Sequence, residues 1–334
     1  MRATLAPRRC GACSFAHIAR LGLALLLALG TATALAQLSS RPITILVPIA
    51  AGGAPDIAAR VVAAKLSEAL GQPVVVENRT GANGNISMDL LARSAPDGHT
   101  LGLLADSQIA INPHLYKNMP LDTLHDLTPV IPVAVNQFVL TVNPSLPVKT
   151  FPEFIEYARK ANPPLAYASG GNGSQHHLTM EMLKRRAGID MLHVPFKGGT
   201  PAAAAAVAGE VAAVWSGSSN AAQIRAGRLR AIAVSGSKRS PLYPDLPTIS
   251  EFYPGFVTEI WLGLFGPANM PQPVLAKLRE ELRKVLESPD TKAKLNSAGG
   301  LNPYVASPDE FNALIKRDYE KYEKVVKDLN LKLD

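Results

Sequence analysis

Short runs of β-branched and aliphatic residues alternate along the chain with longer stretches in which apolar residues recur at helical spacing. Residues 43–47 are typical of a buried strand, and a tight loop at 48–54 leads from them into a helix. Pro55 suits the first position of that helix and Gly71 suits its end, before a second strand at 73–77. Strand, helix and strand in this order form a βαβ unit, so a parallel sheet is expected.

The same alternation continues to the end of the chain. Further strands are predicted at residues 101–104, 130–135, 138–143 and 165–168. Further helices are predicted at residues 86–93, 152–161, 202–208, 273–286, 288–297 and 307–329. Thr200 suits the N-cap of the helix at 202–208, and Pro201 suits its first position.

This order of elements predicts an α/β fold with two lobes around an interlobe cleft, the second lobe being inserted into the first. Residues 37–136 and 262–334 are expected to form the first lobe, and residues 137–261 the second. The three last helices suit a tail that covers the first lobe. Because ligands of such sheets bind beyond the carboxyl ends of the strands, the strand-to-helix loops are where function is expected.

The N-terminal residues form a targeting segment. Four arginines precede the apolar run 21–29, and Ala34-Leu35-Ala36 follows as a cleavage pattern, so residues 1–36 are predicted to be a secretory signal peptide. The apolar run is too short to span a bilayer. We therefore expect a periplasmic protein, and the choice between general and twin-arginine export stays open.

Composition narrows the function further. The 334 residues are 47% hydrophobic and 18% charged, which is typical of a globular chain of about two domains. The formal net charge of +7 falls to +3 without residues 1–36, so no nucleic-acid partner is expected. Cys10 and Cys13 also leave with that segment, which excludes disulfides, thiol nucleophiles and thiolate metal sites from the mature chain.

Two loops have the composition of binding sites. Residues 48–54 lack the motifs of a nucleotide loop, but they place backbone N–H groups at a helix start, which suits a carboxylate; the alternative is a plain tight turn. Residues 168–174 combine three glycines with neutral hydrogen-bonding side chains. A serine nucleophile, Ser169 or Ser174, with His176 or His177 as base is the alternative there, although no third triad member is evident. No metal or cofactor is expected, because no ligand cluster accompanies these histidines.

Many segments together resemble the Bug-type extracytoplasmic substrate-binding proteins of tripartite tricarboxylate transporters. In chain order the matching segments are 41–48, 52–53, 56, 76–79, 81–82, 84, 95–98, 111–113, 167–169, 171–173, 193–198, 238–241, 244–248 and 254–256. The resemblance covers essentially the whole chain after residue 40. It implies a type II periplasmic binding protein fold, in which two lobes close on a small organic acid.

The resemblance also implies which residues contact the ligand. The first loop is implied to hold one carboxylate and the glycine-rich loop the other end of the molecule. The implied ligand-binding residues are Ile49, Ala50, Ala51, Gly52, Gly53, Ser107, Ser169, Gly170, Gly171, Asn172, Gly173, Ser174, His177, Phe196, Lys197 and Gly198. Asp56 is interpreted as stabilising a helix end instead, and Lys197 is alternatively an ordinary surface lysine.

The chain departs from the family pattern at two candidate positions. Ser216 begins the segment where many relatives carry an acid that pairs with a ligand amine, and Asp106 stands where small or neutral residues are usual. Asp106 either points to solvent or caps backbone N–H groups, or it faces the cleft. In the second case the ligand bears a cationic or hydrogen-bond-donating group as well as a carboxylate.

These observations predict a monomeric periplasmic solute-binding protein that captures a small carboxylate by hinge closure and delivers it to transporter membrane subunits. Two other functions stay open at this point. One is an exported serine hydrolase, and the other is a ligand sensor for a membrane signalling kinase. The identity of the organic acid is not predicted.

Overall fold

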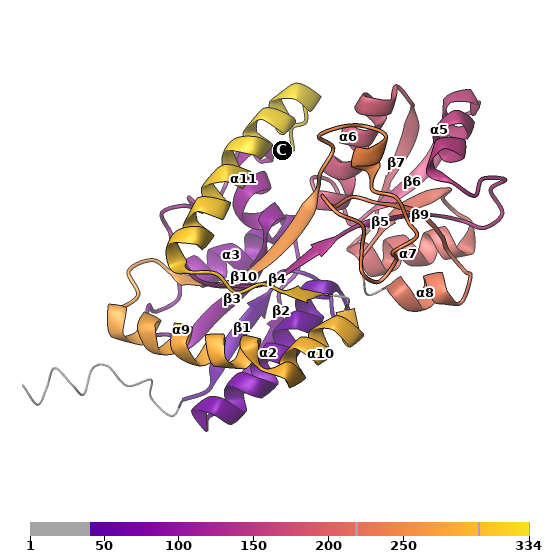
Figure 1. Ribbon diagram of the computed structural model, residues 1–334. Coiled ribbons are helices and arrows are strands. Elements are labelled where there is room, and N and C mark those ends of the chain that lie inside the picture. Colours follow the sequence, from indigo (N-terminus) through magenta and orange to yellow (C-terminus); the bar gives the residue numbers. More distant parts are fainter. Residues whose placement is uncertain (1–40, 218–219, 300, 334) are drawn as a thin grey trace, which may run out of the picture. The chain divides into compact units, whose positions relative to one another are not determined.

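The structure is a computed structural model that describes residues 41–217, 220–299 and 301–333 (Figure 1). The predicted signal peptide, residues 1–36, lies outside the described residues. Within the described part of the chain, no helix is both long and apolar enough to cross a membrane.

The first lobe is built on a six-stranded sheet. Its strands, in spatial order, are β11 (Asn302–Pro303), β4 (Leu127–Gln137), β10 (Glu259–Pro267), β3 (Thr100–Ala105), β1 (Ile43–Val47) and β2 (Val74–Asn78). β1 runs parallel to β2 and β3, so the βαβ unit predicted at the start of the chain is confirmed. β10 is antiparallel to both β3 and β4, which makes the sheet mixed.

The second lobe is built on a five-stranded sheet. Its strands, in spatial order, are β7 (Met191–Pro195), β6 (Leu165–Ser169), β8 (Ala213–Ser216), β5 (Val139–Val142) and β9 (Arg230–Val234). β6 is parallel to β7 and β8, and β5 is antiparallel to β8 and β9. The helices α5 (Phe151–Lys160), α6 (Gln175–Ala187), α7 (Gly199–Ala208) and α8 (Ala221–Arg225) surround this sheet (Figure 1).

Two connections join the sheets, and they lie side by side. The chain leaves the first sheet at Gln137 and enters the second at Val139, and it returns between β9 and β10. Ser235 links the two connections, because its Oγ accepts a hydrogen bond from the Phe138 backbone N–H at 3.0 Å and donates to the Thr258 carbonyl at 2.6 Å. The two crossing segments therefore form one hydrogen-bonded strip.

Local signals explain where the helices begin and end. α2 (Ala54–Leu70) begins at Ala54, so Pro55 takes its second position rather than the predicted first one. The helix ends at Gly71, which adopts a left-handed conformation with φ of 66°, as predicted. The prediction that Thr200 caps α7 is wrong, because α7 starts at Gly199 and its N-cap is Gly198. Gly198 has φ of 115°, which glycine adopts far more readily than threonine, so the helix begins at the glycine pair.

The remaining helices of the first lobe are α3 (Asn85–Ala92), α4 (Asn112–Leu115), α9 (Gln272–Glu287), α10 (Pro289–Gly299) and α11 (Pro308–Leu329), with the short turns η1 (Ala82–Gly84) and η2 (Ser107–Ile111). In the second lobe the turn η4 (Ile249–Glu251) precedes β10. α2, α9 and α10 lie together on one face of the first sheet, and α3 and α11 lie on the other (Figure 1).

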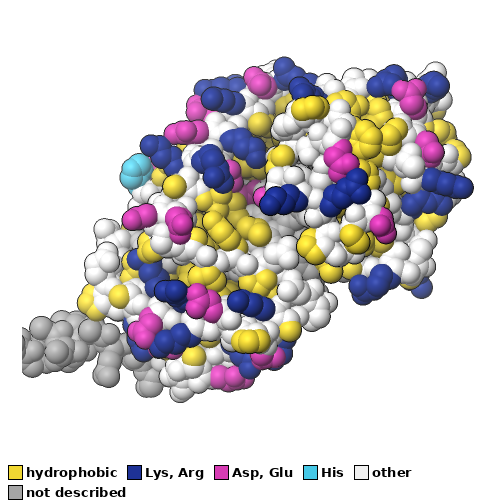
Figure 2. Space-filling view, viewed as in Figure 1, with side chains coloured by type: hydrophobic (Ala, Val, Ile, Leu, Met, Phe, Trp, Pro, Cys, Tyr) yellow, Lys and Arg dark blue, Asp and Glu magenta, His cyan; other side chains and the backbone are white. Residues whose placement is uncertain are grey.

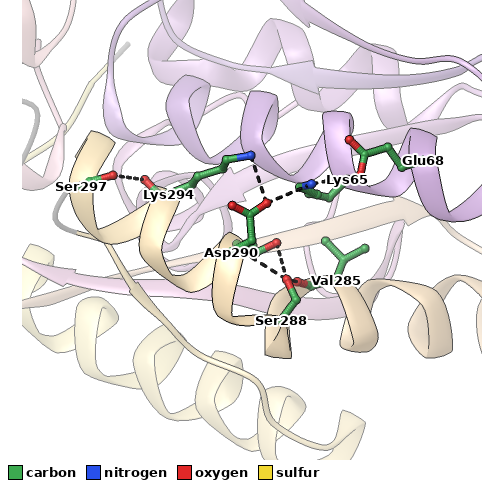
Figure 3. A network of polar contacts seen from close by, with 8 residues as sticks. Lys65, Glu68, Val285, Ser288, Asp290, Lys294 and Ser297 are labelled. Carbon is green, nitrogen blue, oxygen red and sulfur yellow. Dashed lines mark hydrogen bonds and ion pairs between the residues drawn. The ribbon is translucent and has the colours of Figure 1, made fainter.

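The three terminal helices cover the first lobe, as the sequence predicted. Figure 3 shows Asp290 of α10 between two lysines, with its carboxylate 2.9 Å from Lys65 Nζ of α2 and 3.0 Å from Lys294 Nζ of α10. On the other face, Phe311 of α11 packs edge-on against Trp261 of β10. Burying a side chain of this size contributes about 1.5–3 kcal/mol, so this packing holds the tail in place far more strongly than the exposed ion pairs do.

Candidate functional site

One pocket of the described structure is lined by residues from both lobes and has a cavity volume of about 120 Å³. Its walls come mainly from the loops after β1, β3 and β6 and from the two segments that connect the lobes. The lining residues are Ile49, Gly53, Ala54, Pro55, Asn83, Ala105, Asp106, Ser107, Gln108, Asn136, Phe138, Gly170, Ser174, Gln175, His176, Gly198, Gly199, Thr200, Gly217, Asn220, Ile260, Leu262 and Leu301. The pocket therefore lies beyond the carboxyl ends of parallel strands, where the fold places ligands.

Three helix N-termini face this pocket. The first residues of α2, α6 and α7 are all among its lining residues, and these helices have 17, 13 and 10 residues. Each N-terminus carries a partial positive charge and backbone N–H groups without helical partners. No Lys or Arg occurs among the described lining residues, so the attraction for an anion comes from the backbone.

The first loop is shaped by Asp56. Its carboxylate accepts hydrogen bonds from the Gly52 backbone N–H at 2.9 Å, from Asn78 Nδ2 at 2.9 Å and from Arg60 Nε at 3.1 Å. Asn78 Nδ2 also donates to the Ile49 carbonyl at 3.0 Å, which pins the other end of the loop. Burial tends to raise the pKa of Asp56, but these partners outweigh it and lower the pKa below its ordinary value. Asp56 is thus a structural anion and is not among the lining residues.

The loop after β3 continues as one turn of π-helix, η2, and brings three neighbouring side chains to the pocket. They are Asp106, Ser107 and Gln108. Gln108 accepts from the Ala105 backbone N–H at 2.9 Å and donates to the Asn83 carbonyl at 3.1 Å. These bonds join the loop after β3 to the turn before α3, so the two segments form one connected wall of the pocket.

Asp106 does not point to solvent, which was one of the two predicted alternatives. Its side chain is completely buried, and neither carboxylate oxygen has a hydrogen-bond partner in the part of the chain that the structure describes. Burial raises the pKa of Asp106 well above its ordinary value, and the nearby Asp318 raises the pKa further. Lys321, the Ser107 backbone N–H and the Tyr322 hydroxyl lower the pKa, but burial outweighs them.

The glycine-rich loop after β6 is held by neutral groups. Ser169 Oγ lies 2.6 Å from His193 Nε2 and accepts from the Gly171 backbone N–H at 3.1 Å. His177 Nδ1 accepts from the Gly173 backbone N–H at 3.1 Å, and its ring stacks on His193 with centroids 4.0 Å apart. Burial lowers the pKa of both histidines, that of His193 to about 4, so both rings are neutral near pH 7.

The serine and histidine side chains in and after this loop contact neighbouring groups of the protein. Ser169 is fully buried beneath the loop, and Ser174 Oγ caps α6 by accepting from the His177 backbone N–H at 3.3 Å. His176 points the other way from His177: its ring lies 4.4 Å from the ring of Phe138, and it lines the pocket. Burial lowers the pKa of His176 to about 4, so it too is neutral near pH 7.

The structure brings seven of the predicted site residues to the pocket. They are Ile49, Gly53, Asp106, Ser107, Gly170, Ser174 and Gly198. The other predicted residues lie outside its lining: Ala50, Ala51, Gly52, Ser169, Gly171, Asn172, Gly173, His177, Phe196, Lys197 and Ser216. Ser216 is fully buried with its Oγ 2.7 Å from Thr141 Oγ, and Lys197 is exposed.

Seven polar lining residues were not predicted from the sequence as ligand contacts: Asn83, Gln108, Asn136, Gln175, His176, Thr200 and Asn220. The sequence signals that mark them are weak. Asn83 lies in a recognisable turn, where it adopts φ of 50°, and Gln175 and His176 directly follow the N-cap serine of α6. The described residues contain no group of three His, Cys, Asp or Glu that fits a metal ion.

The fold and the pocket are those of a two-lobe periplasmic binding protein. The family model described as tripartite tricarboxylate transporter family receptor matches residues 58–331, and the chain belongs to this family. The family is one of substrate-binding receptors rather than enzymes. The resemblance seen in the sequence and the predicted fold class are both confirmed.

Individual relatives agree with this assignment. The chain is 35% identical over 297 residues to protein BugT of Bordetella pertussis, covering 88% of this chain and 91% of that protein. A solved structure described as R. palustris Rpa4515 with adipate has a TM-score of 0.85 and 32% identity, covering 89% of this chain and 99% of the other. The periplasmic binding protein BugD has a TM-score of 0.82 and 31% identity, covering 88% of this chain and 99% of the other.

Proposed function

We propose that this protein captures a small organic acid in the periplasm and delivers it to the membrane subunits of a tripartite tricarboxylate transporter. The observation that carries the proposal is the convergence of α2, α6 and α7, whose N-termini line one pocket that has no Lys or Arg among its described lining residues. Backbone dipoles of this kind favour a carboxylate, each by about 0.3–1 kcal/mol. The adipate in the structure of the R. palustris relative supports the same ligand class.

Capture proceeds by closure of the two lobes around the strips that join them. We assign residues 37–136 and 262–334 to one lobe and 137–261 to the other. In the present structure the lobes already touch beside the pocket, where Gln175 Nε2 donates to the Tyr322 hydroxyl at 2.6 Å and Asn83 Nδ2 donates to the Gly173 carbonyl at 3.4 Å. A ligand that contacts both walls of the pocket adds to these contacts and shifts the population toward the closed form.

The proposal also covers export, oligomeric state and the class of ligand. Residues 1–36 are a cleaved signal peptide, and the mature protein acts as a monomer without a cofactor. On the face shown in Figure 2, Lys and Arg side chains are interspersed with Asp and Glu, which favours a small-molecule ligand over a nucleic acid. Membrane subunits then recognise the closed lobes.

The short Ser169–His193 contact of 2.6 Å is the one observation that favours a hydrolase. Its geometry fits a structural role better. Ser169 is fully buried and lies outside the pocket lining, and its hydroxyl also donates to the Gly171 carbonyl at 3.1 Å. A nucleophile has to reach the substrate, so we propose that the protein binds its ligand without turnover.

A panel of organic acids tests the proposed function. Mono- and dicarboxylates such as adipate and malate are added to the mature protein, and the melting temperature is measured. A ligand at 100 times its Kd stabilises by about 2.7 kcal/mol, a shift that is readily detected. Adipamide, which has the shape of adipate without its charge, serves as the control. If no acid raises the melting temperature more than adipamide does, the proposed function is wrong.

Small-angle scattering gives a second test that does not depend on stability. A ligand that stabilises the protein is expected to reduce the radius of gyration, because closure brings the lobes together. An unchanged radius at saturating ligand contradicts the hinge mechanism and leaves the binding function intact.

A further inference from the structure

His176 is the one side chain among the described lining residues that can gain a positive charge, since no Lys, Arg or second His lines the pocket there. It is the second residue of α6, and its ring lies beside Gly199, the first residue of α7. His176 therefore stands between two of the three helix N-termini that face the pocket.

The ring nitrogens of His176 have no hydrogen-bond partner among the described residues. The ring packs against Phe138, which offers no polar atom on its side chain. A Cβ atom on Gly170 would lie 3.2 Å from Nδ1, and one on Gly199 would lie 3.1 Å from Nε2, so glycine at both positions leaves room for this edge of the ring. Both glycines line the pocket, and His176 keeps part of its surface accessible. A neutral imidazole thus offers one N–H donor and one acceptor nitrogen to a molecule in the pocket.

The protein supplies no counter-charge to His176. The ionisable groups on the segments around the ring are His177 of α6 and Lys197 before α7, and Asp106 lies in the wall that the other lobe contributes. The ring of His177 stacks on His193, and Lys197 is exposed. Burial alone lowers the pKa of His176, to about 4. An anion in the pocket would be the first charge to act on this imidazole.

We propose that His176 contacts the carboxylate of the bound acid through a ring N–H and takes up a proton from solvent when the acid binds, so that a fall in pH strengthens capture. This inference rests on the proposed function, because it adds a recognition residue to the same pocket. A carboxylate in contact with an imidazole favours its charged form and raises its pKa by about one to three. The resulting charge-assisted hydrogen bond is stronger than a neutral one, and the proton returns to solvent on release.

Calorimetry at two pH values tests the inference. The acid of the panel that raises the melting temperature most, with adipate and malate as first candidates, is titrated into wild-type protein and His176→Gln at pH 7.5 and 5.5. Glutamine keeps a donor and an acceptor but gains no charge. For a pKa rise of about two, the wild-type affinity relative to that of the variant should increase about fourfold between pH 7.5 and pH 5.5. Protonation of the acid itself weakens binding to both proteins alike, so this ratio cancels it.

Proton uptake is a second readout, which a purely structural role of His176 would not change. It is measured at pH 6.0 from the heats of binding in two buffers of different ionisation enthalpy, MES and Bis-Tris. Wild-type protein should take up about half a proton more per bound acid than His176→Gln.

His125→Gln is the matched control, since it makes the same chemical change at an exposed histidine outside the pocket lining. It is expected to keep the wild-type pH dependence. Should His176→Gln not fold, His176→Phe replaces it, because phenylalanine preserves a ring against Phe138 and removes both nitrogens.

The possible failures are distinct. If an acid binds but wild-type protein and His176→Gln show the same pH dependence and the same proton uptake, the inference is wrong and the proposed function stands. If no acid of the panel binds, both are wrong. Loss of the pH dependence in His176→Gln, with wild-type behaviour in His125→Gln, supports both.

Discussion

The loops at residues 48–54 and 169–174 contribute walls to the same pocket, but they are held in shape by different chemistry. Both connect a strand to a helix, β1 to α2 and β6 to α6. The first depends on one ionised carboxylate, Asp56, which accepts from a backbone N–H, an amide and a guanidinium. The second depends on neutral side chains: His193 is hydrogen-bonded to Ser169 and stacks on His177.

This difference predicts how each loop responds to perturbation. A network centred on one charge fails when that charge is removed, and it persists over the pH range in which the charge remains. A network of neutral imidazoles and hydroxyls spreads its energy over several weak bonds, and it fails when the imidazoles gain protons. The first loop should therefore be sensitive to one mutation, and the second should be sensitive to acid.

Removal of Asp56 is expected to have the largest effect. Asp56→Ala leaves the Gly52 N–H and Asn78 Nδ2 without their acceptor, so the free energy of unfolding should fall by about 3 kcal/mol in urea titrations. Asp89→Ala is a matched control, because Asp89 also pairs with an arginine four residues later, Arg93, but shapes no loop. Asp89→Ala should cost about 0.5 kcal/mol or less. Equal losses in the two variants contradict a special role for Asp56.

Acid should selectively weaken the second loop. The pKa values of His176 and His193 are lowered from 6.5 to about 4 in the folded protein, so the unfolded state binds more protons between these pH values. Stability should therefore decline as pH falls from about 7 and reach its full loss near pH 4, by about 2 kcal/mol or more in total. Asp56, whose pKa is lowered, stays ionised through this range and maintains the first loop.

Histidine titration by NMR checks this assignment residue by residue. His193 should remain neutral at pH 5.5. His125 is an internal control of opposite sign, because its hydrogen bond to Asp122 raises its pKa. If His193 titrates together with His125, the neutral network does not hold the second loop.

Much of the fold could be predicted from the sequence, because its signals are local. The strand at 43–47, the proline and glycine that bound α2 and the covering terminal helices all follow from short segments. Other elements carry weak local signals. β8 has only four residues, and α6 is rich in polar side chains, so neither pattern stands out. The antiparallel pairing of β10 depends on contacts between distant segments and leaves no mark in its own sequence.

The candidate site could be predicted only in part, for the same physical reason. Local residues mark the helix starts at Gly53 and Ser174. The position of Gln175 in the pocket wall, in contrast, depends on its hydrogen bond to Tyr322, which is more than a hundred positions away in the sequence. Asp106 shows the limit clearly. Its residue type allowed both an exposed and a buried position, and the packing of α11 against η2 determines which one occurs.

A methyl group on the glycine-rich loop should have a moderate effect. Gly171 has φ of 124°, and a Cβ atom there would lie 3.3 Å from the Phe196 carbonyl oxygen. Gly171→Ala is therefore expected to cost about 1–3 kcal/mol in stability and to weaken ligand binding, since the loop has to shift. Gly188→Ala, at a left-handed position of the same lobe with open space around it, controls for backbone strain alone. Unchanged ligand affinity in Gly171→Ala would separate this part of the loop from the site.

The smallest effect is expected from the hydroxyl of Ser169. Ser169→Ala removes the acceptor of the Gly171 N–H and the partner of His193, and the free energy of unfolding should fall by about 1 kcal/mol in urea titrations. Ser87→Ala is the matched control, because Ser87 is also fully buried but its hydroxyl has no hydrogen-bond partner among the described residues. That change should cost nothing or stabilise the protein slightly, since it removes an unsatisfied polar group. If the two variants lose the same stability, the hydroxyl of Ser169 does not hold the second loop. In that case only the stacked histidines hold the second loop. The comparison with the first loop is then between one carboxylate, that of Asp56, and one pair of imidazole rings.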